Sequence, residues 1–132
     1  MALVEFGATY DIFRVGRNAT ASLDGGFSMV LYEVNLIVKN ALCEEYLPWL
    51  EAHIGEMLQF QGFERSKLWV EEASDQNDAT RYTVHYEISS RGALESYFAE
   101  HAERMRGDGL RRFPEGVSAQ RRIFSSVNLA AS

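Results

Sequence analysis

The feature that most limits how this chain can fold is an alternating stretch at residues 29–39, which reads MVLYEVNLIVK. Every second residue from Val30 to Val38 is apolar or aromatic, whereas the residues between them include Glu33 and Asn35. Side chains of a β-strand point alternately to opposite faces, so the stretch predicts a strand with one face in a hydrophobic core. The other face holds a carboxylate and an amide, and it requires polar partners.

The composition is typical of one globular domain. The chain has 132 residues, of which 46% are hydrophobic and 24% charged, and a domain of this size buries about two-thirds of its unfolded surface. A net charge of −6 argues against nucleic acid or an anionic membrane as the main partner. The lone cysteine, Cys43, excludes an intramolecular disulfide and a cysteine-based zinc site. The chain lacks a signal peptide and an apolar run of about 18 residues, so we expect a cytoplasmic protein that spans no membrane.

A helix is predicted after the first strand. Apolar residues recur at three- and four-residue steps between Asn40, a plausible N-cap, and Gly62, which ends the segment. Pro48 lies inside this pattern and removes one helical hydrogen bond. We therefore expect either a kink or an irregular first turn, with the regular helix beginning near Leu47.

The middle of the chain predicts a β-hairpin. Residues 63–72 and 80–89 both alternate, and the polar cluster 73–79 between them is typical of a turn. The residues of the second strand that we expect in the core are Tyr82, Val84, Tyr86 and Ile88.

The last third predicts a helix and a final strand. Ser89 or Ser90 can cap this helix, and we expect the glycines at 107–109 to stop it. The last strand covers 117–127, and 128–132 is a frayed tail.

Residues 1–28 allow two interpretations. LVEFGATYDIF contains strand-forming residues, whereas NATASLDGGFS is rich in small, turn-forming ones. They form either a flexible upstream extension or an added edge strand, and we expect the folded domain to cover residues 29–127.

The predicted order is strand, helix, strand, strand, helix, strand. It is the βαββαβ order of a ferredoxin-like domain of the α+β class, with a four-stranded antiparallel sheet and two helices on one face. No helix remains to cover the other face, where Leu31, Ile37 and Trp69 lie among polar residues. We therefore expect a second copy of the chain to cover it, giving a homodimer.

Several blocks of the sequence resemble a known family. EEYLPWLEAHIGEMLQFQGFERSKLW, followed by YTVHYEI, YFAEHAERMR and RRIF, resembles the domain of unknown function 4286 over residues 29–127. The most specific block is 44–54, from which Pro48 departs. The resemblance implies a dimeric α+β barrel, a fold that includes small monooxygenases, isomerases and haem-dependent enzymes. It carries over no catalytic residue, and residues 1–28 have no counterpart in it.

Polar residues of the uncovered sheet face are the first ligand-binding candidates. Glu33, Asn35 and His85 share the parity opposite to Val34 and Val84, and the first and third strands of such a sheet are neighbours, so we expect the three to converge. A histidine beside carboxylates can act as a general base or as a ligand of haem or metal. The alternative is a hydrogen-bonded dimer interface, and no spacing such as HxxxH indicates a metal.

Other candidates come from the predicted strand at residues 63–72, from the last strand and from the first helix. Trp69 lies on the uncovered face. Arg121 and Arg122 are successive, so only one can face the pocket, where it would pair with Glu33 or hold an anionic ligand. His53 lies on an apolar helical stripe, where a structural role is the alternative. Periodicity assigns the remaining aromatic residues to the core, namely Tyr46, Trp49, Tyr82, Tyr86, Tyr97 and Phe98.

The function we expect is binding of a small aromatic or anionic molecule in a cleft between sheet and helices. Two alternatives remain open. One is an enzyme of the monooxygenase or isomerase kind with His85 as base, by analogy of fold. The other is a protein-interaction module. We assign no cofactor and no metal, and the sequence does not identify the ligand.

Overall fold

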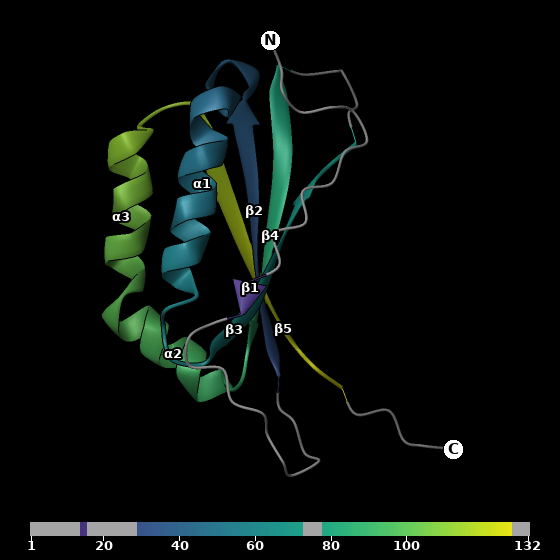
Figure 1. Ribbon diagram of the computed structural model, residues 1–132, viewed down its shortest axis with the longest axis vertical. Helices are drawn as coiled ribbons and strands as arrows, with labels where there is room; N and C mark the ends of the chain where they lie inside the picture. Colours follow the sequence, from purple (N-terminus) through teal and green to yellow (C-terminus); the bar gives the residue numbers. More distant parts are fainter. Residues whose placement is uncertain (1–13, 16–28, 73–77, 128–132) are drawn as a thin grey trace.

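Strand β2, Val30–Lys39, is an inner strand of the antiparallel sheet. It pairs on one side with β4, Ala79–Ile88, and on the other with β5, Val117–Ser125. Strand β3, Phe63–Val70, pairs with the far edge of β4, and the two-residue β1, Arg14–Val15, pairs with β3. The strand order is therefore β1-β3-β4-β2-β5, and every pairing is antiparallel (Figure 1).

This computed structural model describes residues 14–15, 29–72 and 78–127. The pairing of Arg14–Val15 with β3 is what an added edge strand would give. The predictions for the rest of residues 1–28, for the turn residues 73–77 and for the tail 128–132 lie outside the described residues.

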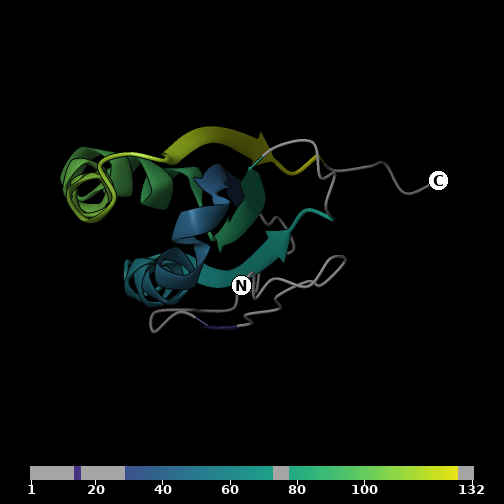
Figure 2. The same ribbon diagram turned by 90° about the horizontal axis from the view of Figure 1, so that it is seen from above.

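Three α-helices lie together on one side of the sheet (Figures 1 and 2). They are α1, Cys43–Met57, α2, Arg91–Glu100, and α3, Ala102–Arg112. The predicted α+β class, the antiparallel sheet of four long strands and the helical layer are confirmed. The opposite face of the sheet, which we call the open face, carries no described helix.

The hydrophobic core forms where the alternating faces of β2 and β4 meet the helices. Val34 lies opposite Val84 in the register, and the residues two steps away continue both apolar faces. A fully buried aliphatic side chain stabilises the fold by about 1.5–3 kcal/mol. Of the strand residues predicted for the core, Val34 is half-buried. The others are buried, namely Val30, Tyr32, Leu36, Val38, Tyr82, Val84, Tyr86 and Ile88.

The start of α1 differs from the prediction. A 3₁₀ turn at Asn40–Leu42 gives the expected irregular start, but the regular helix already begins at Cys43, so the prediction that it begins near Leu47 is wrong. Pro48 lies inside α1 and costs about 3 kcal/mol there, but buried side chains on both sides of it hold the helix against the sheet. Asn40 does not cap the helix, because its side chain accepts a hydrogen bond from Thr80 Oγ1 at 2.6 Å.

The second helical segment is broken into two helices. Ser90 caps α2 as predicted, since its Oγ accepts a hydrogen bond from the Ala93 backbone N–H at 3.1 Å. His101, with φ −132°, separates α2 from α3. The prediction that the glycines at 107–109 stop the helix is wrong. A Cβ at Gly109 would lie 3.1 Å from the Trp49 ring, so this glycine allows α3 to approach α1.

A β-bulge changes one face of β3. The register with β4 shifts between Phe63 and Arg65, so Phe63 lies in the core together with Leu68 and Val70. Simple alternation had placed Phe63 on the same face as Trp69, which is wrong for this reason.

Gly62 provides a test of the connection between α1 and β3. Its φ is +88°, and an added Cβ would lie 2.4 Å from the Cβ of Ala93. We expect Gly62→Ala to lower the free energy of unfolding by about 2–4 kcal/mol, from backbone strain and overpacking together.

The matched control is Gly92→Ala. Gly92 is exposed, and an added Cβ would come no closer to another residue than 3.9 Å, to Ser90 Oγ. Urea unfolding should show a change within about 1 kcal/mol for this variant. Equal destabilisation of both variants would contradict the assigned conformation of Gly62.

Candidate functional site

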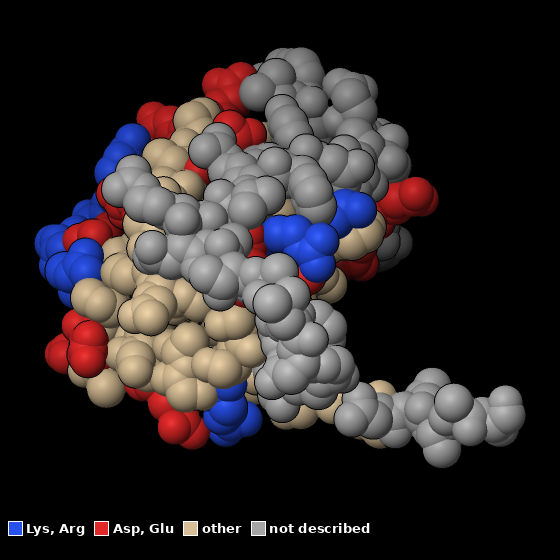
Figure 3. Space-filling model, turned by 60° about the horizontal axis from the view of Figure 1, so that its bottom comes forward, with Lys and Arg blue, Asp and Glu red and all other residues tan. Residues whose placement is uncertain are grey.

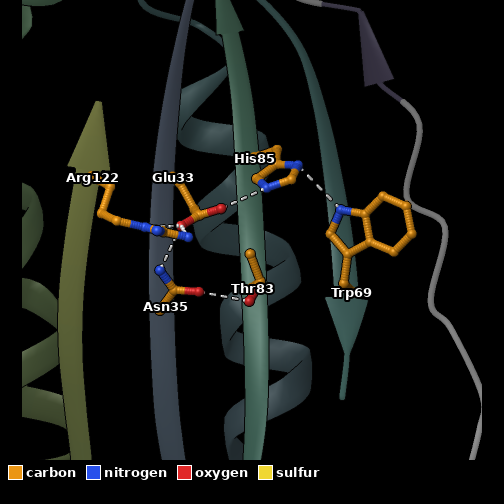
Figure 4. Close-up of polar contacts among 6 residues, drawn as sticks. All are labelled: Glu33, Asn35, Trp69, Thr83, His85 and Arg122. Carbon is orange, nitrogen blue, oxygen red and sulfur yellow. Dashed lines mark hydrogen bonds and ion pairs between the residues drawn. The ribbon is translucent and has the colours of Figure 1, made fainter. Parts of the chain in front are cut away.

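Six polar or aromatic residues form a cluster on the open face of the sheet, drawn in Figure 4. They come from all four long strands, and the register makes Glu33 the neighbour of both His85 and Arg122. We call this group the open-face cluster: Glu33, Asn35, Trp69, Thr83, His85 and Arg122.

The carboxylate of Glu33 is the centre of the open-face cluster. Its Oε1 accepts hydrogen bonds from Asn35 Nδ2 at 2.8 Å and from Arg122 Nε at 2.7 Å, and its Oε2 lies 3.0 Å from His85 Nε2. Burial by itself raises the pKa of Glu33. Hydrogen bonds from these three residues and the charge of Arg122 outweigh burial and leave the pKa below its ordinary value of 4.5. Glu33 is thus an ionised carboxylate that is only 7% exposed.

The partners of His85 determine its tautomer. Trp69 Nε1 lies 3.3 Å from His85 Nδ1, and an indole N–H can only donate, so Nδ1 acts as the acceptor. Nε2 therefore carries the proton, and its N–H donates a hydrogen bond to Glu33 Oε2. A carboxylate-oriented histidine of this kind can act as a general base through its free nitrogen. Here that nitrogen is Nδ1, and the indole of Trp69 already occupies it.

The structure brings together four of the six predicted site residues on the open face and places the other two on the opposite side of the sheet. Glu33, Asn35, Trp69 and His85 lie in the open-face cluster, which Thr83 extends through a hydrogen bond to Asn35 at 2.7 Å. The open question about the two arginines of β5 is resolved by the register, which pairs Arg122 with Glu33 and Arg121 with Val34. Arg121 and His53 both lie on the helical side of the sheet.

A cavity of about 320 Å³ lies on that side, between the sheet and helices α1 and α3. We call it the interlayer cavity. Its aromatic lining residues are Tyr32, Tyr46, Trp49, Tyr86, Tyr97 and Phe113. Its basic or imidazole lining residues are His53, Arg106 and Arg121, and no Asp or Glu is among its described lining residues.

Burial determines which groups of the interlayer cavity are charged. It raises the pKa of Tyr46 and of Tyr97 to about 12, and it raises the pKa of Tyr86 well above 10. Burial lowers the pKa of His53 to about 4, an effect that Asp108 opposes and Arg121 reinforces. At neutral pH the tyrosines are therefore protonated and His53 is uncharged.

Sequence reasoning expected a cleft between sheet and helices, but it did not identify the aromatic lining of the interlayer cavity, because it assigned the tyrosines only to the core. They are buried, as expected, but their rings also line an open space. The signal that could have indicated the cavity is that core positions 32 and 86, on β2 and β4, are occupied by tyrosines and not by purely apolar residues. A buried hydroxyl needs a polar partner, so a cluster of tyrosines indicates a polar feature within an apolar layer.

The described residues offer neither a metal centre nor a membrane segment. No group of three His, Cys, Asp or Glu side chains converges among them. None of the described helices has the length and apolarity to cross a bilayer. In Figure 3, blue and red side chains lie close together at several places on the described part of the face shown.

Comparison with protein families gives a match that covers most of the chain. The model of the family Domain of unknown function (DUF4286) matches residues 29–127, which contain the four long strands and all three α-helices. No curated protein and no solved structure matches the chain.

The lowered pKa of His53 predicts how stability depends on pH. The folded state disfavours the imidazolium, whereas the unfolded chain binds a proton near pH 6.5, so His53 makes the protein lose stability as the pH falls from 6.5 towards 4. His53→Phe keeps an aromatic ring against Trp49, where the rings now stack at 4.7 Å, and removes the titration. Between pH 7.5 and 4.5 we expect wild type to lose about 1–2 kcal/mol more than this variant, because His53 is partly exposed and the full effect is reduced.

Urea unfolding at the two pH values measures this difference. The contribution of Glu33 is the same in both proteins and cancels. Parallel losses of stability in wild type and in His53→Phe would contradict a neutral, half-buried His53.

Proposed function

The chain belongs to the family Domain of unknown function (DUF4286), whose description assigns no activity, and we propose from its own side chains that it binds a small, largely apolar molecule in the interlayer cavity. The observation that carries the proposal is the combination of aromatic walls with a few polar groups that meet in one concave space. Ligand pockets have this composition and volumes of about 300–1,000 Å³. A cavity of about 320 Å³ suits a ligand of one to three rings.

The tyrosine hydroxyls support this proposal. Tyr32 accepts a hydrogen bond from Arg106 Nη2 at 3.3 Å. The hydroxyls of Tyr46, Tyr86 and Tyr97 form no hydrogen bond with any described residue, although each residue is at most 4% exposed. These hydroxyls are not fully enclosed, so each can form a hydrogen bond with a polar group of a ligand in the cavity.

We also propose that the open face binds a second copy of the chain. The order β3-β4-β2-β5 of the four long strands supports a ferredoxin-like domain with β1 added at one edge, and in a dimeric α+β barrel two such sheets face each other. Within the open-face cluster, the Glu33 carboxylate, His85 and the indole N–H of Trp69 already have hydrogen-bond partners, which lowers the cost of burying them in an interface. Apolar side chains of the same face would supply the contact area: Leu31, Ile37, Trp69 and Phe124.

The enzyme and interaction-module alternatives stay predictions. An enzyme would use Nδ1 of His85 as its base, and its substrate would first have to displace the indole of Trp69. The cytoplasmic location also stays a proposal, supported by the free, buried thiol of Cys43.

Filling the interlayer cavity tests the binding proposal. Val34 lines the cavity from β2, so Val34→Phe should place a ring inside it. We expect the affinity for N-phenyl-1-naphthylamine, a neutral fluorescent probe, to fall at least about tenfold, or ~1.4 kcal/mol. The melting temperature should stay the same or rise.

Ile37→Phe is the matched control, because Ile37 lies on the same strand but on the open face. It should bind the probe like wild type. If Val34→Phe proves unfolded, Ala119→Leu fills the cavity from β5 instead. Unchanged probe binding in a folded cavity-filling variant would contradict the proposal.

Light scattering tests the dimer. Wild type should have twice the chain mass of 15.0 kDa. Phe124, which is 39% exposed on the open face, should be buried by the second copy, so Phe124→Asp should give a monomer. Leu110→Asp is the control, since Leu110 is 64% exposed on α3 and should leave the mass at the dimer value. A wild-type monomer at micromolar concentration would contradict the proposed interface.

A further inference from the structure

Arg121, an exposed residue that lines the interlayer cavity, contributes a positive charge there, and no described lining residue is an Asp or Glu that would balance it. It lies on β5 opposite Val34, on the side of the sheet that faces the helices. Among the described residues it has no ion pair and no hydrogen-bond partner. Arg122, the next residue, lies on the other face and binds Glu33. The two arginines therefore have different environments despite being adjacent.

The rest of the cavity lining adds hydrogen-bond donors and no negative charge. Its other arginine, Arg106, donates to the Tyr32 hydroxyl and lies 5.8 Å from the centre of the Phe98 ring. No Asp or Glu is among the described lining residues, although the chain as a whole has a net charge of −6. The positive character of the cavity is thus a local feature and does not follow from the composition.

Arg121 lies close enough to act on several groups of the cavity. Its charge lowers the pKa of Tyr46, Tyr86 and Tyr97, where the larger effect of burial raises it. It also lowers the pKa of His53, where burial has a larger effect in the same direction. Burial keeps the three tyrosines protonated at neutral pH, so their hydroxyls remain donors. A guanidinium also carries five N–H donors in a fixed plane. Donors from several elements therefore surround one space, and its described lining includes no carboxylate.

From this juxtaposition we infer that the interlayer cavity binds a small monocarboxylic acid with an aromatic or branched apolar body. The carboxylate pairs with the Arg121 guanidinium and accepts hydrogen bonds from the tyrosine hydroxyls, while the body lies between the aromatic walls. The inference rests on the proposed function and names its ligand class.

The geometry favours a carboxylate over a phosphate ester. A carboxylate is planar and can accept two parallel hydrogen bonds from one guanidinium. A phosphate monoester carries close to two charges, and the second arginine of the cavity is already engaged with Tyr32 and Phe98. The predominantly apolar walls also suit a ligand with a single charged end.

Pairs of ligands that differ only in charge test the inference. We would titrate the full chain with isovalerate and isovaleramide, 3-phenylpropionate and 3-phenylpropanamide, and 2-naphthoate and 2-naphthamide. Displacement of N-phenyl-1-naphthylamine reports the affinity of each. In wild type, at least one acid should bind about tenfold or more tighter than its amide, as expected for a charge-assisted bidentate pair.

Arg121→Gln should remove the preference for that acid while leaving the affinity for the amide within about twofold, because only the charged contact is lost. Arg122→Gln, which removes the same charge one residue away on the opposite face, should keep the preference. Arg121→Lys keeps the charge but loses the planar fork, so it should retain a reduced preference. It also serves as the test variant if Arg121→Gln fails to fold.

The outcomes separate this inference from the proposed function. If the neutral probe and the amides bind but no acid binds tighter than its amide, or if Arg121→Gln keeps the preference, the carboxylate assignment is overturned and cavity binding stands. If the probe and every ligand fail to bind, both proposals are overturned.

Discussion

The structure depends on strand β2, because its two faces require different environments. One side of this strand must be buried against the helices, and the other holds Glu33, a carboxylate that needs donors around it. Because β2 has a neighbour on each edge, both β4 and β5 can supply those donors, and they do so through His85 and Arg122. Removing one of these donors would leave a largely buried carboxylate short of a hydrogen-bond partner, which destabilises the fold. The same strand therefore organises the hydrophobic core and the polar network.

The two candidate sites lie back to back on this sheet and are separated by side-chain parity alone. Arg121 faces the interlayer cavity and Arg122 faces Glu33, although they are adjacent in the chain. A slip of β5 by one residue would exchange the two arginines and turn Ile123 from the helical side to the open face. The register between β2 and β5 thus determines which arginine is paired and which is available to a ligand.

The interlayer cavity exists because the layers do not close completely over β5. Where α1 and α3 meet, Gly109 lets the helix backbone approach the ring of Trp49. Over β5, the core-side position opposite Leu36 is Ala119, whose small side chain leaves space beneath the helices. The aromatic rings around this space are rigid and large, so they line the cavity without filling it. The polar tips of the tyrosines then give an otherwise apolar space its hydrogen-bonding groups.

The sequence alone determined the elements with strong periodicity. The alternation of β2 and β4 specified their buried faces, and the shared parity of Glu33, Asn35 and His85 specified that they would meet on one side of the sheet. Local patterns could not specify the bulge at Phe63 or the continuation of α3 past Gly107, because both result from packing against other elements. Nor could they assign Arg121 and Arg122 to their faces. Parity states only that the two differ, and the hydrogen bonds between β2 and β5, distant in the chain, decide which of them meets Glu33.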